Sequence, residues 1–418
     1  MGLISRIKKA FSNEDTAGAR YAVFYNENTV GDLVSQLTAI QQSAVYACIR
    51  VLSESIAGLP LHLYELKDNG DSEKAKSHSL YAILGSEPNR EMTAFSFWET
   101  AVTHILLWGN FYAQIIRNGR GDIVELYPLQ PSNMSVKRND KGEIVYKYRR
   151  EPEDEAQSKD QAYSTIVFSQ SEIFHITGLG FDGLIGYSPI ELNKTAIGLT
   201  IACDRYGSSF FSNGAMPGGV LSFPGTVKDP DRVRESWAKG FSGKNANKVA
   251  VLEEGVKYEA ISTDPEKAQF LDTRKFQISE IARIFRVPPH MIGDLQYSSF
   301  SNIEQQSLEF VKYTLEPWLV RIEQAIKRCL LRASEKSKYY AKFNVDGLLR
   351  GDYASRMNGY AIGIQNGYLS PNDVRRLENM NLIPAELGGD RNLVNGNMIG
   401  IDQAGQQYEE GGENNEEK

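Results

Sequence analysis

The chain has 418 residues, of which 41% are hydrophobic and 24% charged, so it can bury cores in roughly two to four domains or subdomains. Its formal net charge of -7 argues against a protein that adheres broadly to nucleic acid or to an anionic membrane. Three widely spaced cysteines form no CxxC or Cys/His pair, which argues against a zinc site and a disulfide framework. No segment has the pattern of a signal peptide, a myristoylation site or a membrane span, so we expect a soluble protein in a reducing compartment.

The first 186 residues predict an α+β region. Apolar residues at helical spacing predict a helix over about 29–57, which Gly58 and Pro60 end, and a strand at 61–64 follows. A second helix is predicted over 93–108. The apolar period then changes to two, with turn residues between the runs, which indicates short strands. These strands are expected at 111–117, 123–129, 134–138, 144–148, 165–168 and 172–176, with a charged loop at 151–162.

The middle of the chain predicts two long helices that bracket a small α/β insert. Ser188-Pro189, an N-cap residue followed by proline, begins the first helix, which continues to about residue 213. Asp264-Pro265 begins the second, which Pro288-Pro289 ends. Their lengths are about 39 and 33 Å at 1.5 Å per residue, so the pair resembles a stalk that carries a head. The insert is expected to contain a strand, a helix and two strands at 220–223, 231–241, 249–252 and 258–261.

Helices dominate the predicted C-terminal third. A polar stretch at 293–302 precedes a capping box, Ser301 with Glu304, which predicts a third long helix to about residue 333. Pro317 lies inside this helix and predicts a kink. A helical segment over 352–382 is expected to stop and restart at Ser370-Pro371. The end, 403–418, is rich in Glu, Asn and Gly, a composition typical of disorder.

One glycine-rich motif raises the alternative of a nucleotide-binding enzyme. Residues 178–183 read GLGFDG and follow a predicted strand. A dinucleotide site needs the helix to begin within the motif, whereas the sequence places the helix start at Ser188, and the acidic residue about 20 positions later, Asp204, lies inside the helix. A flexible surface loop is the favoured interpretation.

Other reactive residue types show no catalytic or metal-binding pattern. The five histidines contain no HxxxH or HExxH spacing, so structural or surface roles are favoured over ligation. Cys203 and Cys329 lie among apolar residues of predicted helices and are interpreted as buried structural thiols. We predict no catalytic residue, no metal and no cofactor. The histidines are His62, His78, His104, His175 and His290.

Two loops are candidate contact surfaces. Lys239, Lys244 and Lys248 surround a Gly/Asn-rich loop at 240–247, which is either a solvated loop or a contact for DNA or a protein partner. The stretch 293–302 is either a linker or a functional loop, and ten residues exceed what a simple corner between two helices needs.

Several short stretches in a fixed order resemble the portal proteins of long-tailed bacteriophages, over about residues 30–395. The acidic tail after residue 403 lies outside the resemblance. The stretches are SAVYACI at 43–49 with IAGLP at 56–60, TAF at 93–95 with FWE at 97–99 and LWGN at 107–110, GYSPI at 186–190, FFSNGA at 210–215 with PGGVL at 217–221, and IARIF at 281–285 with VPP at 287–289.

The resemblance implies a ring-forming α+β portal fold with named regions. The predicted stalk and head correspond to the stem and the clip of that fold. The implied regions are a flexible N-terminal arm at 1–28, an α/β wing at 29–186, stem helix 1 at 187–214, a clip at 215–263, stem helix 2 at 264–288, a tunnel loop at 289–302, a long wing or backbone helix with a return strand at 303–348, a helical crown at 349–395 and a disordered acidic tail at 396–418.

The resemblance also implies a function without catalysis. Portal subunits form a ring, usually of twelve, at one capsid vertex, through which terminase packages double-stranded DNA and from which the genome is later ejected. The implied partners are further copies of the chain, DNA, the terminase large subunit, the major capsid protein or scaffold during procapsid assembly, and the head–tail adaptor, with no membrane. The expected location is the virion, and the host cytoplasm during assembly. The residues expected to face DNA in the tunnel loop are Gln296, Tyr297, Ser298, Ser299, Phe300 and Asn302, and the clip contact would use the three lysines.

Charge is consistent with a DNA conduit. Twelve chains of -7 each carry about -84, and a ring with that charge repels phosphates instead of holding them. The remaining alternatives are the nucleotide-binding enzyme and a scaffold or adaptor that makes no contact with DNA.

Overall fold

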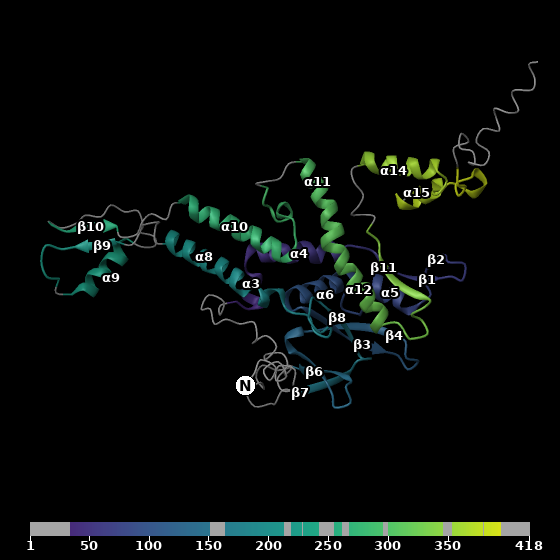
Figure 1. Ribbon diagram of the computed structural model, residues 1–418, viewed down its shortest axis with the longest axis horizontal. Helices are drawn as coiled ribbons and strands as arrows, with labels where there is room; N and C mark the ends of the chain where they lie inside the picture. Colours follow the sequence, from purple (N-terminus) through teal and green to yellow (C-terminus); the bar gives the residue numbers. More distant parts are fainter. Residues whose placement is uncertain are drawn as a thin grey trace, which may run out of the picture. The chain divides into compact units, whose positions relative to one another are not determined.

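A computed structural model describes residues 34–150, 164–212, 219–227, 229–241, 255–260, 267–295, 300–345, 353–378 and 380–393. The chain divides into two compact units, Met1–Asn344 and Val345–Lys418. Helices and small antiparallel sheets are mixed along the first unit, whereas the described part of the second is helical (Figure 1). The predicted α+β class is therefore confirmed.

The first predicted helix is interrupted. In place of one helix over 29–57, the described residues form α3 (Gln36–Ile40) and α4 (Ser43–Ala57). Gln42 is extended, with φ -74° and ψ 125°, so the helical ladder breaks and restarts there. The break lets α3 pack on α7 (Pro189–Leu192), where the Gln36 amide donates to Glu191 Oε1 at 3.1 Å. The expectation of a single helix was wrong because periodicity does not show where a helix changes direction to make a tertiary contact.

Three three-stranded antiparallel sheets support the N-terminal region, in the orders β11-β1-β2, β4-β3-β8 and β5-β6-β7. The six strands predicted over 111–176 are all present, with ends displaced by two residues at most. The first sheet could not be read from local sequence, because β1 pairs with a strand almost 280 residues later, Leu61 opposite Phe343. The strands are β1 (Leu61–Leu66), β2 (Ser72–Lys74), β3 (Asn110–Arg117), β4 (Ile123–Leu129), β5 (Met134–Arg138), β6 (Ile144–Arg150), β7 (Ser164–Ser169), β8 (Ile173–Thr177) and β11 (Tyr339–Phe343).

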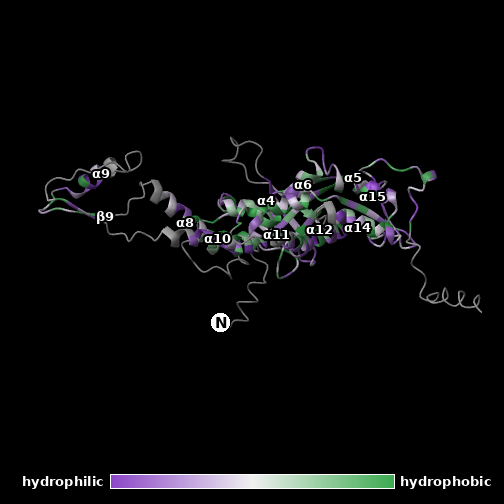
Figure 2. Ribbon diagram, turned by 90° about the horizontal axis from the view of Figure 1, so that it is seen from above, coloured by the Kyte–Doolittle hydropathy of each residue, from purple (hydrophilic) through white to green (hydrophobic). Residues whose placement is uncertain are grey.

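An aromatic cluster forms the core between helices and the central sheet. α6 (Ala94–Trp108), the second predicted helix, packs on α4 and β3, and hydrophobic residues are frequent along α4, α6 and α12 (Figure 2). Trp98 and Phe97 meet edge to face at 5.1 Å between ring centroids, and Phe97 meets Phe111 at 5.5 Å. The buried Trp98 indole N–H donates to the Leu84 carbonyl of α5 (Ser79–Gly85) at 3.0 Å. Burying such rings contributes roughly 3 kcal/mol each, which fixes the sheet against the helices.

The two long helices are antiparallel neighbours. α8 (Lys194–Ser212) and α10 (Lys267–Phe285) lie side by side (Figure 1). Arg274 of α10 bonds Asp204 of α8 at 3.0 Å, and the Gln277 amide contacts Cys203 Sγ at 3.2 Å. Ser188 caps the first helix as predicted, since its hydroxyl accepts the Glu191 amide hydrogen. However, Asn193 separates the one-turn α7 from α8, so the predicted single helix is two.

A small module is inserted between α8 and α10. Its two strands, β9 (Gly219–Ser222) and β10 (Lys257–Ala260), pair antiparallel, and α9 (Pro230–Phe241) lies between them in sequence. Trp237 of α9 stacks on Tyr258 of β10 with 5.7 Å between centroids, which joins the helix to the strands. These elements match the predicted strand, helix and last strand. The predicted strand at 249–252 and the predicted helix start at 264–265 lie outside the described residues.

The third long helix contains a π-helical turn where a kink was expected. α11 (Phe300–Glu309) begins one residue before the predicted cap, continues as a π-helix (η5, Phe310–Leu315) and then as α12 (Glu316–Cys329). Pro317 has no amide hydrogen, and its ring would press on the carbonyl of the preceding turn. The wider π turn removes that conflict, and the Glu316 amide bonds Val311 O instead of an α partner. The helix ends at Cys329, short of the predicted residue 333.

The second unit contains α14 (Tyr353–Gln365), α15 (Pro371–Leu377) and the short η6 (Ala385–Leu387). The predicted restart at Ser370-Pro371 is confirmed: Ser370 and Asp373 form a reciprocal capping box, and those hydrogen bonds lower the pKa of Asp373. The Glu378 carboxylate joins the helices by accepting from the Tyr360 hydroxyl at 2.8 Å. α15 ends at residue 377, so the predicted helical extent to 382 was too long.

Candidate functional site

The chain leaves α10 through a tightly bonded turn at the start of the predicted tunnel loop. The amide of Arg286 donates to Arg283 O at 3.2 Å, and that of Val287 donates to Ala282 O at 2.9 Å. These two bonds define a Schellman helix end, in which the residue after the cap adopts the left-handed conformation. Arg286 does so with φ 57°, the only described non-glycine residue with positive φ. Left-handed backbone disfavours a side-chain-bearing residue by about 1 kcal/mol, so the surroundings must hold this turn.

Two hydrogen bonds tie the loop's flanks together. The Thr314 hydroxyl, in the π-helical turn, donates to Arg286 O at 2.7 Å. His290, in the 3-10 helix η4 (Pro289–Ile292), lies with Nδ1 2.7 Å from Gln306 Oε1 of α11. A carbonyl oxygen only accepts, so His290 Nδ1 carries the proton in this pair. The loop therefore leaves and re-enters a fixed base, and its span is set by the fold.

A groove of about 490 Å³ opens beside this base, between α10 and the rod formed by α11 and η5. It is mainly apolar, with Arg283 and Glu309 at its margin. Tyr313, 51% exposed, lies on its wall. The lining residues that define it are Ser279, Arg283, Pro289, Glu309, Phe310 and Tyr313.

The structure places only part of the predicted DNA-facing set. Phe300 and Asn302 lie in the first turn of α11, so the irregular chain between η4 and α11 spans only 293–299 of the predicted 289–302. Gly293, with φ 89°, begins that segment. The other four candidates, Gln296, Tyr297, Ser298 and Ser299, lie outside the described residues.

Of the three predicted clip lysines, Lys239 lies in the last turns of α9. Lys244 and Lys248 lie outside the described residues, so their proximity to Lys239 stays a prediction. The module also has a hollow of about 270 Å³ between α9 and the strands, lined by Leu221, Phe223, Val233, Arg234, Trp237 and Tyr258.

The glycine-rich motif at 178–183 belongs to a packed backbone corner. A Cβ on Gly186 would lie 2.1 Å from Gly109 O, and one on Gly180 would lie 2.2 Å from Ile185 O. Gly178 likewise faces Gly109, to whose carbonyl its amide donates at 2.8 Å. The glycines are therefore required by close backbone contact, and the prediction of a simple flexible surface loop missed this packing. The helix begins only at Pro189, so no helix N-terminus faces the motif as a dinucleotide would need.

A buried polar network connects this corner to the sheets. Asn110 Oδ1 accepts from the Gly186 amide at 2.8 Å, and its Nδ2 donates to Gly186 O at 2.8 Å. His175 Nε2 lies 3.2 Å from the same Oδ1, and its Nδ1 lies 3.2 Å from the Tyr146 hydroxyl. With Nε2 protonated and the tyrosine donating to Nδ1, each of these contacts has one donor and one acceptor. Burial, with a smaller effect of Arg328, lowers the pKa of His175 to about 3, so the ring is neutral. Sequence patterns predicted a structural role for this histidine but not its partners.

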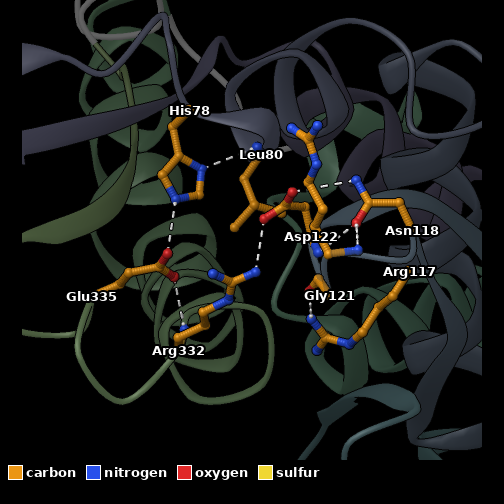
Figure 3. Close-up of polar contacts among 9 residues, drawn as sticks. His78, Leu80, Arg117, Asn118, Gly121, Asp122, Arg332 and Glu335 are labelled. Atoms are coloured by element: carbon orange, nitrogen blue, oxygen red, sulfur yellow. Dashed lines mark hydrogen bonds and ion pairs between the residues drawn. The ribbon is translucent and has the colours of Figure 1, made fainter.

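A second polar cluster joins α5, the β3–β4 turn and the turn after α12 (Figure 3). Arg332 bonds Asp122 at 2.7 Å, and Glu335 accepts the Arg332 amide at 2.9 Å while lying 3.7 Å from His78 Nε2. The Arg117 side chain bonds Gly121 O at 3.1 Å. A cavity of about 300 Å³ lies beside them. Because the acidic and basic groups bond one another, the cluster links three segments and offers no unbalanced charge to a ligand.

The thiols differ from expectation in burial. Cys203 and Cys329, predicted to be buried, are partly accessible, whereas Cys48 of α4 is buried. Burial raises the pKa of the Cys48 thiol to about 12, which keeps it protonated. Among the residues that the structure describes, no group of three His, Cys, Asp or Glu side chains has a metal-binding arrangement. Nor does any helix in those ranges have the length and apolar character needed to cross a membrane.

Sequence comparison assigns the family. The sequence model of the phage portal protein family matches residues 43–379, so the chain belongs to that family. The portal protein of Enterobacteria phage HK97 is 38% identical over 357 residues, which cover 84% of this chain and 81% of that protein. The probable portal protein of Streptomyces phage phiC31 is 37% identical over 367 residues, which cover 86% and 79%. The expected portal resemblance is thereby confirmed.

Solved structures show the same fold. An HK97-family phage portal protein from Corynebacterium diphtheriae aligns with a TM-score of 0.55 at 15% identity, over 74% of this chain and 95% of that one. A chain from the neck of a native gene transfer agent particle, computed with C12 symmetry, aligns with a TM-score of 0.54 at 20% identity, over 83% and 93%. The chain therefore has the portal fold.

Proposed function

We propose that this chain forms the dodecameric portal ring at one capsid vertex of a tailed phage, through which genomic DNA is packaged and later ejected. The family match over 43–379 is the observation that carries the proposal. The twelvefold symmetry of the gene transfer agent neck supports the subunit number by analogy. In this proposal the chain acts as a structural conduit in the virion, assembled in the host cytoplasm, and performs no catalysis.

The parts of the chain would take the roles that their place in the fold suggests. The α8–α10 pair serves as the stem, and the module of β9, α9 and β10 as the clip, which meets the terminase large subunit during packaging and the head–tail adaptor afterwards. The N-terminal α+β region serves as the wing, which meets the capsid protein or scaffold when the ring nucleates procapsid assembly. α14 and α15 belong to the crown.

The loop between η4 and α11 is the proposed DNA-contacting element. Its base is fixed by the Thr314–Arg286 and His290–Gln306 bonds, so the segment between them is presented from a rigid support. The predicted loop residues are polar or aromatic, and a net charge of -7 per chain opposes tight phosphate binding, as a conduit requires.

Packaging by loop variants tests this role. Tyr297→Asp, or deletion of 296–300, should permit ring assembly but reduce DNA packaging into procapsids. Lys141→Ala, in the exposed β5–β6 turn, is the control and should package normally. Normal packaging by the loop variants would refute the loop's role, and a wild-type chain that never forms rings would refute the portal assignment itself.

A further inference from the structure

Exposed apolar side chains form a stripe along α8. Leu199 and Tyr206 are 47% and 52% exposed, and Leu192, seven residues before Leu199 in the adjoining α7, is 46% exposed. A seven-residue interval is close to two helical turns, so Leu199 and Tyr206 lie above one another on one side of α8. Large apolar residues gathered on one helix face are a mark of an interaction surface.

Helix geometry shows that this stripe faces away from α10. Asp204 points toward α10, because it bonds Arg274. Each residue turns the helix by about 100°, so Tyr206, two residues later, points about 160° away from Asp204. Ile197 and Ile201, on the opposite side from Leu199, are buried. The stripe is thus the outer face of α8 in the helix pair.

α10 has a corresponding outer face. Phe276 is 58% exposed and follows Arg274 by two residues, so it points about 160° away from the bond to Asp204. Arg283, seven residues after Phe276, is also exposed and lies at the margin of the 490 Å³ groove beside Tyr313. The pair therefore presents two different apolar faces on its two opposite sides.

A hollow also lies at the lower end of the α8 stripe. Leu192 borders a cavity of about 280 Å³, whose other walls include Leu179, Phe285, Pro317 and Trp318. Each outer face of the pair thus combines projecting apolar side chains with an adjacent recess. Two unlike faces on opposite sides suit head-to-tail association, in which one copy's first face meets the next copy's second face.

We propose that neighbouring copies of this chain meet through these two faces, the Leu199 and Tyr206 side of α8 in one copy packing against the Phe276 side of α10 in the next. The inference rests on the ring assembly proposed above and assigns the residues that join it. A second copy is the occupant that covers both faces at once, because every copy supplies one of each. Repetition of this contact closes into a ring when the rotation between copies closes.

Two single variants test the contact. Leu199→Asp and Phe276→Asp each place a charge in the proposed interface and should weaken pairwise association at least about thirtyfold, so that rings give way to monomers in native mass measurement. Both residues are exposed in the single chain, so thermal unfolding of the monomers should be unchanged. Val167→Asp is the matched control: Val167 is 57% exposed, lies opposite Lys147 in β6–β7, and should leave rings intact.

Mixing the variants tests that the contact is head-to-tail. A Leu199→Asp copy keeps its α10 face, and a Phe276→Asp copy keeps its α8 face, so an equimolar mixture should form one-to-one dimers but no rings. Rings from either single variant would overturn the interface, although the portal assignment would stand. Loss of rings with Leu199→Asp but not with Phe276→Asp would show a contact between like faces and would also overturn it. Absence of rings from the wild-type chain under assembly conditions would instead refute the proposed function.

Discussion

Replacing Asn110 by alanine should strongly destabilise the N-terminal unit. The substitution removes the acceptor of the Gly186 amide and of His175 Nε2, and the donor to Gly186 O. Asn110 and His175 are 5% and 1% exposed, so water cannot replace these bonds without rearrangement. Each buried polar group left unpaired destabilises by roughly 1–3 kcal/mol, which gives a loss of about 4 kcal/mol in the free energy of unfolding.

Urea unfolding followed by tryptophan fluorescence would measure this loss, since Trp108 lies beside the site and its carbonyl accepts from Asn110. Amide exchange should also increase over 178–190, because the corner there is bonded to the Asn110 side chain. Asn118→Ala is the matched control: it removes side-chain bonds in an exposed β3–β4 turn and should lose about 1 kcal/mol or less. Equal, small losses for both variants would refute the reasoning that the buried network holds the corner.

Three further outcomes follow from the packing, the buried histidines and the loop base. Gly186→Ala should prevent folding because its Cβ would meet Gly109 O at 2.1 Å, whereas Gly119→Ala, with open space around it, should express normally; soluble yield checks both. Burial lowers the pKa of His175 to about 3 and of His104 to about 4, from 6.5, so only the unfolded chain takes up these protons near pH 5. Stability should therefore fall as pH drops below about 6.5, by about 2 kcal/mol per histidine at pH 5, and urea midpoints that do not change between pH 7 and 5 would contradict this. Thr314→Val removes the bond to Arg286 O and should lower stability by about 1 kcal/mol and speed proteolysis within 289–299; unchanged cleavage would show that this bond does not hold the loop base.

Local signals predicted the elements whose ends have chemical markers. Ser188-Pro189 and Ser370-Pro371 begin helices as expected, because a hydroxyl cap and a proline satisfy or remove the first amide donors whatever the tertiary context. Alternating apolar residues likewise predicted the strands between 110 and 177. The resemblance in short motifs then identified the family, and the GYSPI stretch proved to lie in the bonded corner around Gly186.

Features set by distant contacts could not be read from the sequence. The interruptions at Gln42 and Asn193 depend on how α3 and α7 pack, and the pairing of β1 with β11 joins segments almost 280 residues apart. The role of the GLGFDG glycines depends on the approach of Gly109, which no local pattern encodes. The candidate loop was chosen from its length and residue types, and only its fixed base is described by the structure.

End-on electron microscopy of the purified assembly tests the central claim most directly. The account predicts a closed ring of twelve copies around a bore wide enough for a DNA duplex, with the α8–α10 pairs of adjacent copies in contact around it. Particles that remain single chains under assembly conditions, or rings with no open bore, would contradict it.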